Sequence, residues 1–288
     1  MKKLYFILIA ITICLNGFAQ IPVDTSYWKK GGIGTLTFSQ LSLYQWAAGG
    51  ENSFSGTGLL NIFANYKKDK NSWDNTLNLE YGLMKQGDLT KKSSDKIDFS
   101  SKYGRKASEK WNYSALLGFK TQFAPGYNYP NDSTIISNAF SPAYITFSLG
   151  MDYKPNDDFS LFLSPLTGKI TIVSDDSLSF YGAYGVEPGS KIRSEFGGFI
   201  KASYKKTLMK NVDLMTKLEL FSNYFENPQN IDVNWELLIS MKVNEFLAAT
   251  ISTQVIYDDD IDVPRGNDGP GPGIQIKEVF GIGLSYKF

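Results

Sequence analysis

Polar and apolar residues alternate along much of this chain with a period of two. Between Trp73 and Leu83, one set of alternate positions carries Trp, Asn, Leu, Leu, Tyr and Leu, and the other carries Asp, Thr, Asn, Glu and Gly. The stretch from Ile231 to Val243 repeats the pattern. Because successive residues of a strand point to opposite faces, these stretches predict β-strands with one apolar and one polar face.

About twelve segments show this strand pattern, separated by turn residues. They span residues 33–47, 54–67, 71–86, 95–107, 111–123, 142–154, 159–173, 193–206, 211–225, 231–243, 246–257 and 274–288. Strands of soluble sheets usually have about five or six residues, whereas a tilted membrane strand needs roughly nine to eleven. The segment lengths therefore favour a membrane barrel over a soluble sandwich.

The connections between these segments alternate in length. Those after the second, fourth, sixth, eighth and tenth segments are short, and those after the third, fifth, seventh and eleventh are longer, with 124–141 and 174–192 the longest. The compact connections after the first and ninth segments depart from the rule. Short periplasmic turns alternating with longer outer loops are typical of outer-membrane barrels. We therefore expect an all-β fold: a transmembrane antiparallel β-barrel of about 12 strands with both termini periplasmic.

Alternation fails in two segments. In the first, the apolar parity changes between Phe38 and Leu41, which predicts a β-bulge near Ser39 and Gln40. In the seventh, Pro165 cannot donate a hydrogen bond to a neighbouring strand. A bulge or strand break is therefore expected at residues 164–165.

Aromatic residues cluster at the ends of the predicted strands. Rings at the membrane–water interface are typical of barrels, although Tyr and Trp are also common in strands generally. The periplasmic ends carry Tyr66, Trp73, Trp111, Tyr153, Tyr204 and Tyr286, and the opposite ends carry Tyr81, Phe123, Tyr224 and Tyr257. The last segment alternates apolar residues from Phe280 to a terminal Phe288, which resembles the C-terminal strand of outer-membrane barrels.

The first residues have the pattern of a secretory signal peptide. Lys2 and Lys3 precede an apolar run of eleven residues and a small-residue cleavage site after Ala19. We therefore expect residues 1–19 to be a signal peptide and 20–288 to be the outer-membrane β-barrel. The run is shorter than the roughly 20 residues of a spanning helix. Lipidation at Cys14 is disfavoured because residues 11–13 match a lipoprotein box poorly.

Composition excludes several classes of function. Lys plus Arg and Asp plus Glu are both 29, so no basic excess favours nucleic acid. The chain has no His, which excludes catalytic triads, Cys–His dyads and His-ligated zinc. Its single Cys lies in the signal peptide, so the mature barrel has no disulfide. Removal of Lys2 and Lys3 takes the formal charge from zero to minus two.

We assign no catalytic, cofactor-binding or metal-binding residue and expect no enzyme activity and no cofactor. An acidic loop with Asp258, Asp260 and Asp262 resembles a calcium loop. The resemblance fails because Val263 stands where such a loop needs Gly, and Gly269 where it needs Glu. A solvated loop is the preferred interpretation.

Several segments resemble one family of outer-membrane proteins, the domain-of-unknown-function family 3078. The fairly specific element is Trp-Ala-Ala-Gly-Gly-Glu-Asn at 46–52. Similar segments lie at residues 28–32, 38–40, 46–53, 73–75, 81–82, 101–104, 120–127, 150–156 and 164–169. The resemblance implies an outer-membrane β-barrel and no known activity.

The predicted lumen face is polar and of mixed sign. It includes Asp74, Glu80, Lys102, Lys106, Lys120, Glu195, Lys201, Lys217, Glu219, Asp232, Glu236 and Lys242. Either these charges pair across the barrel and plug it, or they line a narrow water-filled pore. About twelve strands give a bore wider than that of eight-stranded barrels, which side chains fill.

Three functions remain open. The first is a structural or accessory barrel, with membrane lipid and other outer-membrane or periplasmic proteins as partners and no nucleic acid. The second is a narrow channel for small solutes. The third is a hydrophobic-ligand transporter, for which an apolar lumen stretch would come from Leu59, Phe63, Leu116, Phe199, Phe221 and Leu238.

Overall fold

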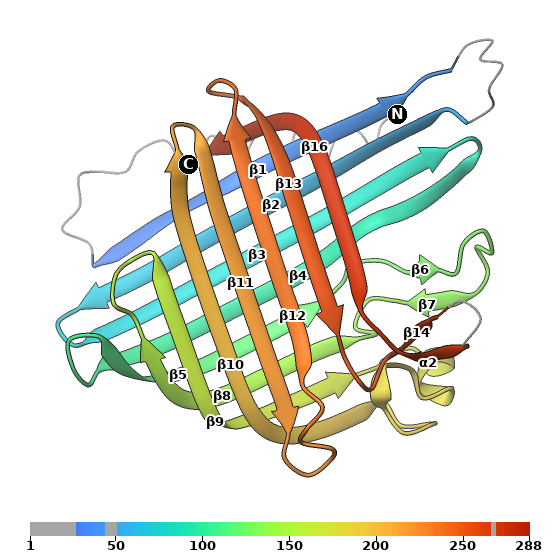
Figure 1. The fold of residues 1–288 in the computed structure, drawn as a ribbon. Helices are drawn as coiled ribbons and strands as arrows, with labels where there is room; N and C mark the ends of the chain where they lie inside the picture. Colours follow the sequence, from blue (N-terminus) through green and yellow to red (C-terminus); the bar gives the residue numbers. More distant parts are fainter. Residues whose placement is uncertain (1–26, 44–50, 266–268) are drawn as a thin grey trace, which may run out of the picture.

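The computed structural model describes residues 27–43, 51–265 and 269–288. Twelve antiparallel strands close into a barrel in the order β1-β16-β13-β12-β11-β10-β9-β8-β5-β4-β3-β2 (Figure 1). The strands are β1 (Trp28–Leu41), β2 (Ser53–Lys68), β3 (Asn71–Gln86), β4 (Leu89–Lys106), β5 (Trp111–Thr121), β8 (Ala143–Tyr153), β9 (Phe159–Ile172), β10 (Ile192–Met209), β11 (Val212–Asn223), β12 (Asp232–Lys242), β13 (Leu247–Tyr257) and β16 (Gln275–Lys287). The predicted fold class and strand number are confirmed. The predicted signal peptide lies outside the described residues.

The barrel closes where its first and last strands meet. Six residue pairs join β1 to β16, from Ile33 with Lys287 to Phe38 with Ile282, whereas fourteen join β1 to β2. The backbones of Gly32 and Phe288 exchange two further hydrogen bonds of 2.9 and 3.1 Å. The C-terminal Phe288 is therefore held against β1 at the seam.

Two strands differ most from their predicted bounds. The first strand is Trp28–Leu41 rather than 33–47, because the glycine-rich stretch at 31–34 pairs fully with β2 although it shows no alternation. The fourth strand begins at Leu89 rather than 95, so the connection expected to be long is the tight turn of Gly87 and Asp88. Gly87 has a φ of +56°, which glycine adopts readily.

Of the two expected bulges, one is absent and one is present. Strand β1 pairs with β2 without a register shift along its whole length. The prediction of a bulge near Ser39 and Gln40 was therefore wrong. The change of parity falls at the end of the strand, where it needs no bulge. The register of β9 shifts against both neighbours beside Ser164 and Pro165, which confirms the second bulge.

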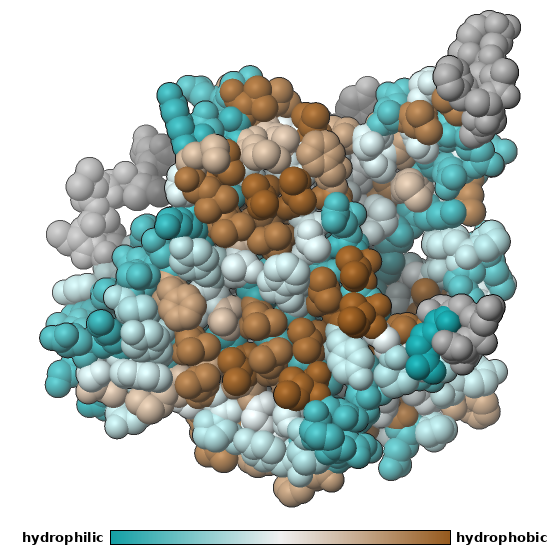
Figure 2. Space-filling model, viewed as in Figure 1, coloured by the Kyte–Doolittle hydropathy of each residue, from teal (hydrophilic) through white to brown (hydrophobic). Residues whose placement is uncertain are grey.

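The outer face of the barrel is an apolar band. On β16, Phe280, Ile282 and Leu284 are 61%, 51% and 56% exposed. Figure 2 shows apolar side chains gathered over the strands at the front of the barrel. None of the described helices is long and apolar enough to cross a membrane. Long strands with this outward band make the protein a transmembrane β-barrel of the outer membrane.

Aromatic rings meet at the periplasmic strand ends. The ring of Trp28 lies 5.2 Å from that of Tyr66 and 5.8 Å from that of Trp73. Trp111 and Tyr153 pair at 5.0 Å on the next part of the rim. These contacts form the expected interfacial belt on this side of the membrane.

The long connections gather at the opposite, outer end of the barrel (Figure 1). They contain β6 (Gly126–Tyr127), β7 (Ile135–Ser137), α2 (Asp176–Phe180), η1 (Ala183–Gly185), β14 (Asp262–Pro264) and β15 (Pro270–Pro272). Val173, Leu178 and Val186 form a small buried core beneath them. Asp175 caps α2, and the backbone N–H of Leu178 lowers the pKa of its carboxyl.

Candidate functional site in the lumen

Seven charged side chains meet at mid-height in the lumen. We call them the central cluster: Lys96, Asp98, Lys120, Lys201, Lys217, Glu219 and Glu236. They come from β4, β5, β10, β11 and β12. Each points inward because it alternates with the apolar residues of the outer face. Four ammonium groups therefore face three carboxylates at one level.

The central cluster bridges the whole lumen. The Nζ of Lys96 lies 2.7 Å from Oε1 of Glu236, yet their strands, β4 and β12, are six steps apart in a ring of twelve. The ammonium of Lys217 on β11 lies 2.8 Å from the carboxylate of Asp98 on β4, five steps away. The wall positions are thus opposite one another, and their side chains join across the bore.

Two carboxylates of the central cluster are buried, so each of them needs a positively charged partner. Asp98 is 2% exposed and Glu219 is 7% exposed. Glu219 accepts a hydrogen bond from Lys120 and pairs with Lys201 at 3.1 Å. A buried carboxylate without a cation would carry a desolvation penalty of several kcal/mol, at least about 3. The cluster is therefore a crossbar of paired charges rather than a set of free charges.

A second cluster lies toward the periplasmic end. Lys102 on β4 pairs with Asp152 on β8 at 2.8 Å, and Lys154 pairs with Asp74 on β3 at 2.9 Å. Burial would lower the pKa of Lys154, but the carboxylate of Asp74 outweighs burial, so that pKa lies above its ordinary value. This periplasmic cluster is balanced in charge, with two lysines and two carboxylates.

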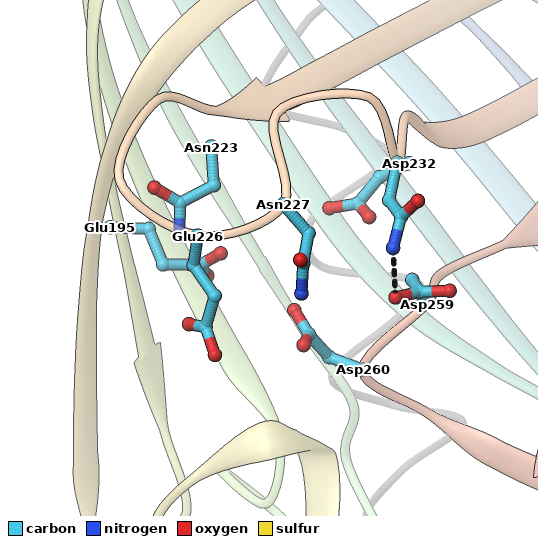
Figure 3. Close-up of a pocket in the computed structure, with 8 residues that line it drawn as sticks. Glu195, Asn223, Glu226, Asn227, Asp232, Asp259 and Asp260 are labelled. Atoms are coloured by element: carbon cyan, nitrogen blue, oxygen red, sulfur yellow. Dashed lines mark hydrogen bonds between the residues drawn. The ribbon is translucent and has the colours of Figure 1, made fainter.

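A third cluster, the outer cluster, is rich in carboxylates. Lys169 lies 2.7 Å from Asp232 and 3.5 Å from Glu195, and Arg193 lies 2.8 Å from Asp260. Figure 3 shows these carboxylates around a cavity of about 20 Å³. That volume holds about one water molecule.

The acidic loop contributes to this outer cluster. Asp258 lies 4.0 Å from Lys169. Burial raises the pKa of its carboxyl, and the nearby carboxylate of Asp232 raises it further. Asp259 accepts a hydrogen bond from Asn230. Among the described residues, no three acidic or other metal-binding side chains are arranged to hold a metal ion.

The lumen wall formed by β13, β16, β1 and β2 is different. We call its mid-height inward positions the neutral wall: Thr250, Ser252, Val279, Gly281, Gly283, Thr35, Thr37 and Thr57. Lys277, above them on β16, reaches Glu80 on β3 at 3.1 Å. Small side chains on this wall fill less of the bore than the long charged ones opposite.

An apolar group also lies in the lumen. Leu116, Phe162, Phe199 and Phe221 form a buried cluster beside the charges. The Nζ of Lys169 lies 4.9 Å from the centre of the Phe221 ring, a cation–π contact. Three residues of the expected apolar stretch are thus brought together, whereas Leu59, Phe63 and Leu238 lie outside this cluster.

Most of the expected lumen charges take part in these clusters. Lys106 and Lys242 do not belong to them and lie exposed near the periplasmic ends of β4 and β12. The sequence analysis missed several partners: Lys96, Asp98, Asp152, Lys154, Lys169, Arg193 and Lys277. Lys96 and Asp98 share the strand parity of Lys102, so alternation was the signal that could have placed them in the lumen.

Solved structures similar to this chain are outer-membrane barrels. The COG4313 outer membrane channel from Pseudomonas putida F1 is 11% identical, with a TM-score of 0.42 over 93% of this chain and 100% of that one. The NanC porin is 7% identical, with a TM-score of 0.39 over 90% and 100%. Outer membrane phospholipase A from Escherichia coli is 10% identical, with a TM-score of 0.36 over 93% and 92%. TM-scores this low carry no argument about function.

Sequence comparison matches one part of the chain to a protein family. No curated protein matches the chain. The family of proteins of unknown function DUF3078 matches residues 38–127, which hold the Trp-Ala-Ala-Gly-Gly-Glu-Asn element and strands β2 to β5. The resembling segments at 28–32, 150–156 and 164–169 lie outside this match. The resemblance is confirmed over the matched residues, and the protein is an outer-membrane β-barrel that carries the DUF3078 segment.

Proposed function

We propose that this protein is a structural or accessory barrel of the outer membrane whose lumen is held shut by ion pairs. The observation that supports this most is the 2.7 Å contact between Lys96 and Glu236, whose strands lie on opposite sides of the barrel. This contact and the 2.8 Å contact between Lys217 and Asp98 both stand across the bore, in the way of ions. Two charges in a low-dielectric bore attract strongly, so opening carries a large cost.

Catalysis forms no part of this proposal. The sequence contains no His. Glu219 and Asp98, the most buried acids of the central cluster, are each within 3.1 Å of a lysine ammonium. Carboxylates neutralised in this way are poor general bases, because proton uptake would break the pair.

The accessory part of the proposal concerns partners, for which we expect other outer-membrane or periplasmic proteins. Native outer membranes are extracted in mild detergent, and the particle that contains this protein is weighed. A particle much heavier than one chain plus detergent, with other polypeptides in it, is the expected result. A particle of one chain would contradict the subunit role and leave a self-sufficient barrel.

A narrow channel for small solutes is the second candidate. The neutral wall favours it, because the short side chains of Thr37, Thr57 and Ser252 reach less far into the bore than the long charged side chains opposite. Vesicles that contain the purified protein and a trapped, impermeant dextran are diluted into an iso-osmotic solution of a small sugar. Swelling would favour the channel, and no swelling relative to protein-free vesicles is what the closed barrel predicts.

A further inference from the structure

An apolar hollow of about 350 Å³ lies in the barrel wall between β9, β10 and β11. Its lining includes Leu163, Gly198, Ile200, Leu220, Tyr224 and Ile231. On β10 and β11, Phe199 and Phe221 belong to the lumen cluster, so the alternate residues Gly198, Ile200 and Leu220 face the membrane. We call this feature the outer-wall hollow.

The hollow exists because of a local break in the strand pairing. Beside Pro165 the register between β9 and β10 shifts, with Gly197 opposite Thr167 and Phe199 opposite Ser164. Gly198 thus stands opposite two residues of β9 and presents no side chain to the membrane. A Cβ at Gly198 would come within 2.9 Å of the Tyr224 hydroxyl oxygen. The ring of Tyr224 thus lies over Gly198, and the hollow lies beside this ring, next to the bulge.

One side of the hollow is polar and the rest is apolar. The hydroxyl of Tyr224 donates a 3.1 Å hydrogen bond to the carbonyl oxygen of Pro165 and so spans the outer edge of the hollow. Tyr rings mark the headgroup level of a membrane barrel. Leu163, Ile200 and Leu220 lie below that edge, toward the middle of the bilayer. The feature therefore has the polarity of a lipid, with a polar top and an apolar body.

The surroundings decide what can occupy the space. Ile200, Tyr224 and Ile231 are 38%, 46% and 45% exposed, so the hollow opens outward onto the apolar band. Hydrocarbon covers this band in the membrane, and an apolar site without several polar partners does not retain water. We propose that the outer-wall hollow binds one acyl chain of an outer-leaflet lipid, with the polar end of that lipid near Tyr224.

Photo-crosslinking in vesicles tests this site. The full protein is reconstituted into phosphatidylcholine vesicles that contain phosphatidylcholine with a diazirine on one acyl chain. After illumination, adducts are located by digestion and mass spectrometry. Adducts at Leu163, Ile200 and Ile231 should exceed those at Leu237, an outward residue of β12 away from the hollow, by about tenfold, the ratio that a 1.4 kcal/mol preference gives.

The Gly198→Leu substitution fills the hollow. The number of adducts at Leu163, Ile200 and Ile231 should therefore fall to the level at Leu237. Gly168→Leu is the matched control, because Gly168 also faces outward and a Cβ there meets no atom within 4 Å. Ile200→Phe fills the space by a second route if the Gly198 variant does not fold. Folding of each variant is verified by its resistance to unfolding in cold detergent. Even labelling around the barrel, or unchanged labelling in folded Gly198 and Ile200 variants, would overturn the proposal.

Discussion

The two halves of the lumen wall differ in the interactions that their inward side chains make. On β4, β5 and β10 to β12, long charged side chains reach across the bore and pair, as Lys217 does with Asp98 at 2.8 Å. On β13, β16, β1 and β2, the inward residues at the same height are small and uncharged, and they sit beside the seam between the first and last strands. Side-chain pairs thus join the walls of the paired half across the bore, whereas backbone pairing joins the strands of the neutral half at the seam.

This contrast separates two physical problems of a twelve-stranded barrel. Its bore is too wide for ordinary side chains to fill from one wall. Ion pairs between opposite walls solve that problem, but each charge is then stable only while its partner is present. At the seam the problem is close backbone approach, which glycine allows. Substitutions in the two halves should therefore destabilise the barrel for different reasons.

The largest effect is expected from removing one buried partner of the central cluster. Glu219→Ala leaves Lys120, Lys201 and Lys217 facing two carboxylates, which should lower the free energy of unfolding by about 3–5 kcal/mol. Ser252→Ala on the neutral wall should change it by less than about 1 kcal/mol. Urea titration of both variants in lipid vesicles measures the difference. Equal midpoints would show that the paired half is not a stabilising crossbar.

A smaller effect is expected at the seam. The Cβ of Gly283→Ala would overlap the carbonyl oxygen of Leu36 on β1. Relieving this overlap requires β1 and β16 to separate, at a cost of about 1–3 kcal/mol. Gly168→Ala is the control, since its Cβ meets no atom within 4 Å. The same urea titrations apply, and a Gly283 variant as stable as the Gly168 variant would contradict the close approach at the seam.

The smallest effect on stability is expected in the outer cluster, and it depends on pH. Burial raises the pKa of Asp258 above 3.8 in the folded state, so folding favours its protonated form. Its ionised form therefore costs stability as pH rises above 3.8 and through the folded pKa. Asp258→Asn should be more stable than wild type at pH 7 and equal to it near pH 3. An Asp258→Asn variant that is less stable than wild type at pH 7 would contradict this prediction.

Asp175 offers the opposite sign as a comparison. The backbone N–H of Leu178 and the side chain of Asn138 lower its pKa, so its ionised form adds stability above 3.8. Asp175→Asn should therefore lose stability at pH 7 and match wild type in acid. Two substitutions of the same chemistry with opposite signs would separate the local environments from a general effect of charge.

Sequence alternation predicts most of this fold because it is a local signal. The bounds of β3 coincide with the prediction, and most other strands begin and end within two residues of it. Strand β1 was displaced because Gly31, Gly32 and Gly34 interrupt alternation while still pairing with β2. The bulge at Pro165 was predictable because proline lacks a backbone N–H.

The lumen contacts were not predictable in the same way. Alternation places Lys217 and Glu236 on the inner face but does not say which residues stand opposite them. That depends on the stagger of all twelve strands, which sets whether β4 meets β11 or another strand at a given height. Whether the charges pair or line a pore was therefore open in the sequence, and the 2.7 Å contact between Lys96 and Glu236 supports pairing.

Single-channel recording in planar bilayers tests the closed lumen most directly. Lys96→Ala with Glu236→Ala removes one charge of each sign from the crossbar and leaves Lys120 and Lys201 paired with Glu219. We predict no conductance steps for wild type or for a Thr57→Ala/Ser252→Ala control on the neutral wall, and clear steps for the double variant. Wild-type steps of the same size as those of the double variant, or silence in both, would contradict the account.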